Sequence, residues 1–214
     1  MTVPVFGVMF GHGFSVGSYF MSCVETAARK LGAVKDRDFP KIVLSSVVTD
    51  CMAHNGSIVD QNKFMVEAET ASRVFEAAGV TDVINLCVSL NTYTQQIMNH
   101  TNWRFHKLDA EFPETDFVFM SKVAYESKAF DSLRTNNRLV AEKLIDAAQY
   151  NDYSTMNAEF NKLLQPFTFS HGSILLGCTD LSVHLNWFQN TFHNEFFDPV
   201  ADMAWKVAQM NAES

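Results

Sequence analysis

The first clear sign of the fold is the segment Val3-Pro-Val-Phe-Gly-Val-Met-Phe10, which runs directly into Gly11-His12-Gly13. A mostly apolar run followed by a glycine-rich turn indicates a buried β-strand that ends in a loop. The chain then becomes helical, because apolar residues recur at helical steps until Gly32 ends the pattern. These apolar residues are Tyr19, Phe20, Cys23, Val24, Ala27, Ala28 and Leu31.

The same alternation of strand and helix continues along the first half of the chain. Residues 41–48 form a β-branched apolar run, residues 64–78 carry a helical apolar stripe that Gly79 ends, and residues 83–88 form another apolar run. Near-continuous apolar strands that alternate with helices are typical of a parallel sheet covered on both faces, with right-handed crossovers. The sequence therefore predicts a βαβαβ arrangement.

The second half shows a similar but weaker pattern. Strands are expected at residues 103–108, 117–123 and 173–178, and helices at residues 139–148, 156–164, 181–188 and 200–210. We expect Thr179-Asp180 to cap the helix that follows the strand ending at Cys178. No repeat, low-complexity tract or Gly/Ser linker divides the chain.

Composition narrows the class of protein. The 214 residues are 47% hydrophobic, which is enough for a substantial core, and 16 basic against 24 acidic residues give a formal charge of −8. A negative charge of this size argues against nucleic acid as a partner. The sequence also lacks an apolar run long enough to span a bilayer and an N-terminal signal peptide, so we expect a soluble cytoplasmic protein without a membrane partner.

The four cysteines are scattered without CxxC spacing, which indicates free thiols. Two of them, Cys87 and Cys178, end predicted strands, where ligands bind in open parallel sheets. Cys178 also precedes a predicted helix, whose free N–H groups would lower the pKa of its thiol. Simple core packing is the alternative, because cysteine is a common buried residue. Cys23 is expected in the core, and no role is assigned to Cys51.

The motif Leu176-Gly-Cys-Thr-Asp-Leu181 resembles the second cysteine motif of the aspartate/glutamate racemase superfamily, with the acidic residue of the aspartate racemase-like branch. Gly7-Val-Met-Phe-Gly-His-Gly13 resembles the opening motif of aspartate racemases, and Phe197-Asp-Pro199 resembles the motif before their last helix. Residues 77–87 resemble the stretch that leads into the first catalytic cysteine. The resemblance covers most of the chain.

This resemblance implies an α/β fold of two similar lobes, each a short, mostly parallel sheet flanked by helices, with the active site between them. Residues 1–100 would form the first lobe, rejoined by the C-terminal helix 198–214, and residues 101–197 would form the second. It further implies a homodimer and a small carboxylic acid or amino-acid substrate. Cys87 and Cys178 would be the catalytic pair, one removing a proton α to the carboxylate and the other delivering one.

No cofactor is required for this chemistry, and no metal-binding spacing such as HxH or HExxH occurs. Hydrogen-bond donors must stabilise the negative charge that develops on the substrate. Hydroxyl, amide and imidazole side chains, together with a loop glycine that allows close approach, are the candidates for substrate binding. They are Gly11, His12, Ser45, Ser89, Asn91, Thr92, Ser121 and Thr179.

Alternatives remain open at this stage. Anchoring the first cysteine motif on Asn91-Thr92 places Leu90 at the cysteine position, which would leave one thiol and predict a lyase, isomerase or decarboxylase, or an inactive binder of small acids. Gly11 to Gly17 also matches a dinucleotide-binding glycine pattern, which is weak evidence alone. A distal carboxylate on the substrate would favour an arginine partner, and the sequence offers no evident arginine there, which argues against aspartate or glutamate as the substrate. Arg104 and Arg134 are the candidates for that role.

Overall fold

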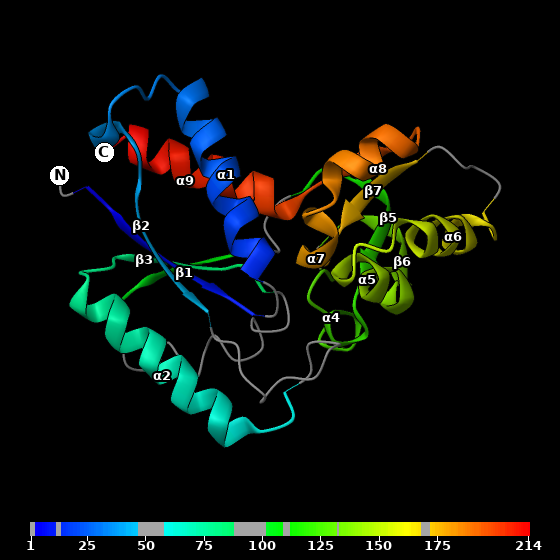
Figure 1. Ribbon diagram of the computed structural model, residues 1–214, viewed down its shortest axis with the longest axis horizontal. Helices are drawn as coiled ribbons and strands as arrows, with labels where there is room; N and C mark the ends of the chain where they lie inside the picture. The colour runs from blue at the N-terminus through cyan, green and yellow to red at the C-terminus, as the bar shows by residue number, and fades with distance from the viewer. Residues whose placement is uncertain are drawn as a thin grey trace.

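The computed structural model describes residues 3–11, 14–46, 58–87, 102–108, 112–131, 133–167 and 172–214. Two four-stranded parallel sheets form the framework, and helices flank both of them (Figure 1). This arrangement confirms the predicted α/β class. The division into lobes at residue 100 remains a prediction.

The first sheet has the strand order β2-β1-β3-β4, with every strand parallel to its neighbours. Its strands are β1 (Val5–Phe10), β2 (Lys41–Ser46), β3 (Asp82–Asn85) and β4 (Arg104–Lys107). Its helical elements are α1 (Phe14–Lys30), the short 3-10 helix η1 (Asp36–Asp38) and α2 (Gln61–Ala77). A Cβ atom at Gly7 would lie 2.8 Å from the ring of Phe75, so the glycine lets α2 pack closely against β1.

The second sheet has the order β6-β5-β7-β8 and is also parallel throughout. Its strands are β5 (Thr115–Met120), β6 (Thr135–Val140), β7 (Ser173–Leu176) and β8 (Glu195–Phe197). The helices around it are α4 (Lys122–Glu126), α5 (Glu142–Gln149), α6 (Tyr153–Leu164), α7 (Thr179–Ser182) and α8 (Leu185–Thr191).

Several details differ from the sequence predictions. Leu139 and Val140 end the edge strand β6 instead of beginning a helix, because their apolar side chains belong to a strand whose other residues are mainly polar. The helix predicted after Cys178 is divided into α7 and α8, and β8 was not predicted.

Strand β4 pairs with β3 and completes the first sheet.

The last helix, α9 (Pro199–Ala212), returns from the second sheet and packs along α1 beside the first sheet (Figure 1). Asp198 caps its N-terminus by accepting a hydrogen bond from the Val200 N–H at 2.9 Å. One apolar cluster joins α1 and α9 to strands of both sheets, and includes Phe6, Phe20, Val118, Leu175 and Met203. The two sheets therefore share a continuous core.

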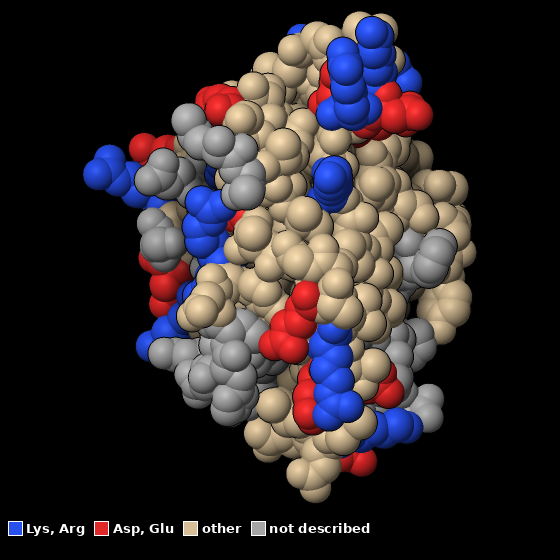
Figure 2. Space-filling model, turned by 90° about the vertical axis from the view of Figure 1, so that its left-hand side faces the viewer, with Lys and Arg blue, Asp and Glu red and all other residues tan. Residues whose placement is uncertain are grey.

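Charged side chains of both signs are interspersed on the molecular face in Figure 2, without a broad patch of one sign. This distribution gives no sign of a nucleic-acid interface on that face. Within the described ranges, no helix combines the length and the apolar character needed to cross a membrane.

Candidate functional site

Cys178 is placed by a tight turn at the carboxyl end of β7. The preceding residue, Gly177, lies so close to β5 that a Cβ atom would be 2.9 Å from the carbonyl oxygen of Phe119 and 2.9 Å from Val118 Cγ1. Cys178 then serves as the N-cap residue of α7, with extended backbone geometry. The thiol is therefore held between a sheet edge and the first turn of a helix.

A carboxylate and an amide surround the Cys178 thiol. The Sγ of Cys178 lies 3.9 Å from Oδ2 of Asp180, within reach of a weak S–H hydrogen bond. The same oxygen of Asp180 accepts a hydrogen bond from Gln149 Nε2 at 3.0 Å. Because Gln149 ends α5, this contact joins α5 to the turn that carries Cys178.

Burial raises the pKa of the Cys178 thiol well above its ordinary value, and the negative charge of Asp180 raises it further. A hydrogen bond from the backbone of Asp180 acts in the opposite direction but is outweighed. The prediction that the helix start would lower this pKa is therefore wrong. Helix α7 has only four residues, so its N–H groups do not offset the loss of hydration around the sulfur.

Cys87 follows β3 in the other sheet. Its side chain is half-buried and packs against the apolar cluster beneath α2, and its backbone N–H donates to Asn85 Oδ1 at 3.0 Å. The charge of an ionised Cys87 is one of the causes that raise the pKa of Cys178. The structure therefore brings the two thiols within electrostatic range, although they follow strands of different sheets.

Two further predicted residues lie at neighbouring strand ends of the second sheet. Ser121 follows β5 and caps α4, where its buried Oγ accepts from the Ala124 N–H at 3.2 Å. Thr179 is buried in the first turn of α7, directly after Cys178. Glu142, at the start of α5, accepts from the Lys122 N–H and also contributes to the raised pKa of Cys178.

The predicted residues of the first sheet are only partly described. Gly11 is buried directly after β1, which lies between β2 and β3. Ser45 is half-buried near the end of the edge strand β2, where it pairs with Met9. The other candidates lie outside the described residues, as does the alternative first-motif position, and they are His12, Ser89, Asn91, Thr92 and Leu90.

Sequence reasoning missed Gln149, because nothing in the local pattern links a residue at the end of α5 to Asp180, which lies 31 positions later in the chain. Arg104, a candidate partner for a distal carboxylate, instead pairs with Asp82 at 2.8 Å at the opposite end of β3 from Cys87. Among the residues described, no group of His, Cys, Asp or Glu side chains is arranged to hold a metal ion.

No protein-family model matches the sequence, and no curated protein sequence is significantly similar to it. Several solved structures are similar in fold. The aspartate racemase of Picrophilus torridus is 14% identical, with a TM-score of 0.63 over 96% of this chain and 95% of that one. A glutamate racemase from Francisella tularensis, in complex with D-glutamate, is 11% identical, with a TM-score of 0.68 over 99% of this chain and 81% of that one.

An allantoin racemase from Klebsiella pneumoniae has a TM-score of 0.55 and 13% identity over 98% of this chain and 89% of that one. At these identities the likeness concerns the fold, which extends over nearly the whole chain in each comparison. The resemblance suggested by the cysteine motifs is therefore confirmed at the level of architecture: this chain has the two-sheet fold of the aspartate and glutamate racemase structures.

Proposed function

We propose that the protein is a cofactor-independent racemase or isomerase that moves a proton at the carbon α to a carboxylate, with Cys87 and Cys178 as the acid and base. The observation that carries this proposal is the position of the two thiols, which follow strands of different sheets and lie close enough for a charge on Cys87 to raise the pKa of Cys178. Transfer of a proton between opposite faces of one carbon requires two such groups, one on each side.

The coupling of the thiols suits this chemistry. Because a negative charge on Cys87 raises the pKa of Cys178, ionisation of both sulfurs together is disfavoured. The proposed mechanism uses the form of the pair in which the two sulfurs share one proton. A thiolate removes the α-hydrogen, the thiol on the other side gives its proton to the carbon, and the enzyme ends with the proton on the opposite sulfur. The number of protons is conserved in each turnover.

Donors at the neighbouring strand ends would hold the substrate. Ser121 uses its oxygen lone pair in capping α4, so its hydroxyl hydrogen can still be donated to a carboxylate. The buried Thr179 lies beside Cys178 and offers a hydroxyl and a backbone N–H. Such fixed donors stabilise the enediolate charge that develops when the α-proton leaves.

The substrate is proposed to be an aspartate-like amino acid or another small carboxylic acid, bound by a homodimer. The fold alone does not choose among substrates, because structures of this architecture include aspartate, glutamate and allantoin racemases. A second candidate is an isomerase, lyase or decarboxylase that uses one thiol. The raised pKa of Cys178 favours it, since a thiol that stays protonated can serve as a lone general acid.

The experiment is a screen of small carboxylic acids, including both enantiomers of aspartate and glutamate, for deuterium incorporation at Cα in deuterated water. Cys87→Ser and Cys178→Ser should each lower racemisation by at least about 1,000-fold, because a serine hydroxyl is too weakly acidic to supply the anion. Cys23→Ser is the matched control, since that half-buried thiol lies on α1.

Three outcomes distinguish the candidates. Loss of activity in both variants supports the two-thiol mechanism. Full turnover in Cys87→Ser, together with an inactive Cys178→Ser protein, would establish the single-thiol alternative. Absence of exchange with every acid tested would contradict both the two-thiol and the single-thiol enzyme and would favour an inactive binder of small acids.

A further inference from the structure

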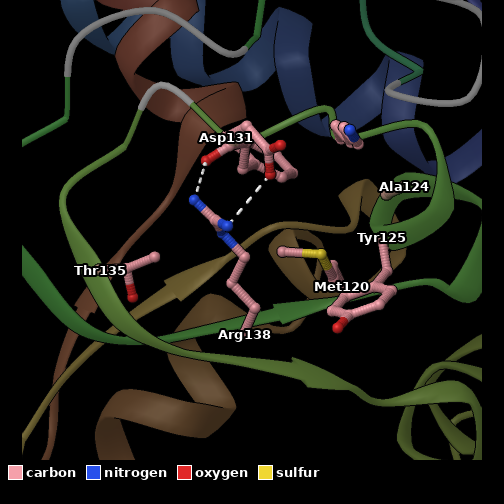
Figure 3. A pocket seen from close by; sticks show the side chains of 8 residues that line it. Met120, Ala124, Tyr125, Asp131, Thr135 and Arg138 are labelled. Carbon is pink, nitrogen blue, oxygen red and sulfur yellow. Dashed lines mark hydrogen bonds and ion pairs between the residues drawn. The ribbon is translucent and has the colours of Figure 1, made fainter.

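A cavity of about 410 Å³ lies between α4 and β6 in the second sheet, and neither catalytic candidate lines it (Figure 3). Part of its wall is apolar, formed by Met120, Ala124 and Phe130, all of which belong to the core cluster shared by the two sheets. The hydroxyl-bearing side chains of Tyr125 and Thr135 complete other parts of the wall. The cavity therefore combines an apolar surface with polar groups, as small-molecule sites do.

The polar side of the cavity is dominated by Arg138 from β6, whose guanidinium extends between Asp131 and Met120 (Figure 3). Its Nη1 pairs with Asp131 Oδ1 at 3.0 Å, and its Nη2 donates to the carbonyl oxygen of Phe130 at 3.1 Å. Its Nε is buried, and no described group accepts a hydrogen bond from it. A buried donor without an acceptor is unusual in a folded protein.

The charged side chains that line the cavity favour an anionic ligand. Arg138 and Lys128 bring two positive charges to the lining, and Asp131 brings one negative charge, so the cavity is locally positive in a chain of net charge −8. The N–H groups on the two terminal nitrogens of a guanidinium match the two oxygens of a carboxylate. The apolar wall requires that the remainder of such a ligand be hydrophobic.

We propose that this cavity binds a small carboxylate with an apolar body, whose oxygens accept from Arg138 and whose body packs on Met120 and Phe130. Nη1 and Nη2 each carry a second N–H besides those directed at Asp131 and Phe130, and these hydrogens would donate to the ligand. Asp131 competes for the same guanidinium, so its carboxylate limits the affinity of the site. The site is separate from the one in the proposed function and does not depend on it.

The cavity nevertheless lies next to the turn that carries Cys178. The Cε2 atom of Phe130 lies 3.0 Å from the position that a Cβ on Gly177 would take, so the Phe130 ring packs directly against the residue before Cys178.

The test is a titration of the full-length protein with benzoate and, as the uncharged probe of the same shape, benzamide, followed by calorimetry or protein NMR. We expect benzoate to bind at least about 10-fold more tightly than benzamide, since the carboxylate makes charge-assisted hydrogen bonds. Arg138→Gln should weaken benzoate binding at least about 10-fold, and Arg138→Lys should weaken it less. Asp131→Asn should strengthen it several-fold, because it releases the guanidinium.

Arg29→Gln is the matched control, because Arg29 also forms an ion pair with a carboxylate but lies on α1. It should leave benzoate affinity unchanged. Equal affinities for benzoate and benzamide, or full benzoate affinity in a folded Arg138→Gln protein, would overturn the proposal. The Cys178→Ser protein should bind benzoate as wild type does. Loss of binding there would place benzoate in the thiol site and also overturn the proposal, whatever the outcome of the racemisation assay.

Discussion

The Sγ of Cys178 lies 3.9 Å from Oδ2 of Asp180, and the pKa of the thiol is raised by burial first and by this carboxylate second. The two residues are near neighbours in sequence, but the position of the carboxylate is not set locally. Asp180 is also fixed by Gln149 from α5, so a helix distant in sequence sets the charge next to the sulfur.

Asp180→Asn should lower the pKa of Cys178, because it removes a nearby negative charge from a poorly hydrated site. The measurement is the pH dependence of alkylation by iodoacetamide in a protein whose other cysteines are replaced by serine. The reaction midpoint should move to lower pH. Asp146→Asn, on the exposed side of α5, is the control, and an equal shift there would refute the assignment to Asp180.

Tyr19→Phe should destabilise the protein by about 1–3 kcal/mol. The Tyr19 hydroxyl donates to Asp198 Oδ2 at 2.6 Å, and Asp198 is only 7% exposed, so the variant leaves a buried carboxylate with one partner fewer. Urea denaturation measures the free energy of unfolding. Tyr125→Phe, at a half-exposed tyrosine, should change it by less than about 0.5 kcal/mol, and similar losses in both variants would contradict this account.

The stability of the protein should fall in acid partly because of Asp82, at the start of β3. Burial alone would raise the pKa of Asp82, but hydrogen bonds outweigh it and hold this pKa below its ordinary value. The donors are Thr81, Arg104 and His106. The folded state therefore favours the ionised form, and this stabilisation is present above the unfolded pKa of about 3.9 and is lost as the pH falls through the lower folded pKa.

Asp82→Asn should consequently reduce the free energy of unfolding at pH 7 and flatten its decline below about pH 4. Urea denaturation between pH 7 and pH 3 provides the measurement. Asp36→Asn serves as the control, because Asp36 is exposed in η1. An unchanged acid dependence in Asp82→Asn would show that other carboxylates account for the decline.

Gly177→Ala should cost about 1–3 kcal/mol, because the added methyl group meets the backbone oxygen of Phe119, which cannot move away as a side chain can. Displacement of the turn should also lower any activity that depends on Cys178. Gly17→Ala is the comparison. Its methyl group would lie 3.2 Å from the ring of Phe10, and alanine favours the helix, so the change in unfolding free energy should be small. Equal costs would argue against the backbone clash.

The sequence alone was enough to predict the helices and strands whose hydrophobic pattern is local. The apolar run before Gly11 is β1, the stripe that includes Phe20 is on α1, and the run before Cys178 is β7. Such patterns show which side of a segment is buried, and they can be interpreted without knowledge of the rest of the fold. Strand β6 was not predicted, because Asn137 and Arg138 interrupt its apolar character at the edge of the sheet.

The environment of the thiols arises from contacts between segments that are distant in sequence. The sequence places Cys87 and Cys178 at strand ends, but their electrostatic coupling depends on how the two sheets pack through a common core. The direction of the Cys178 pKa shift was predicted wrongly for the same reason. A helix start is visible in the sequence, whereas loss of hydration and the approach of Asp180, held by Gln149, arise only when distant segments pack around the sulfur.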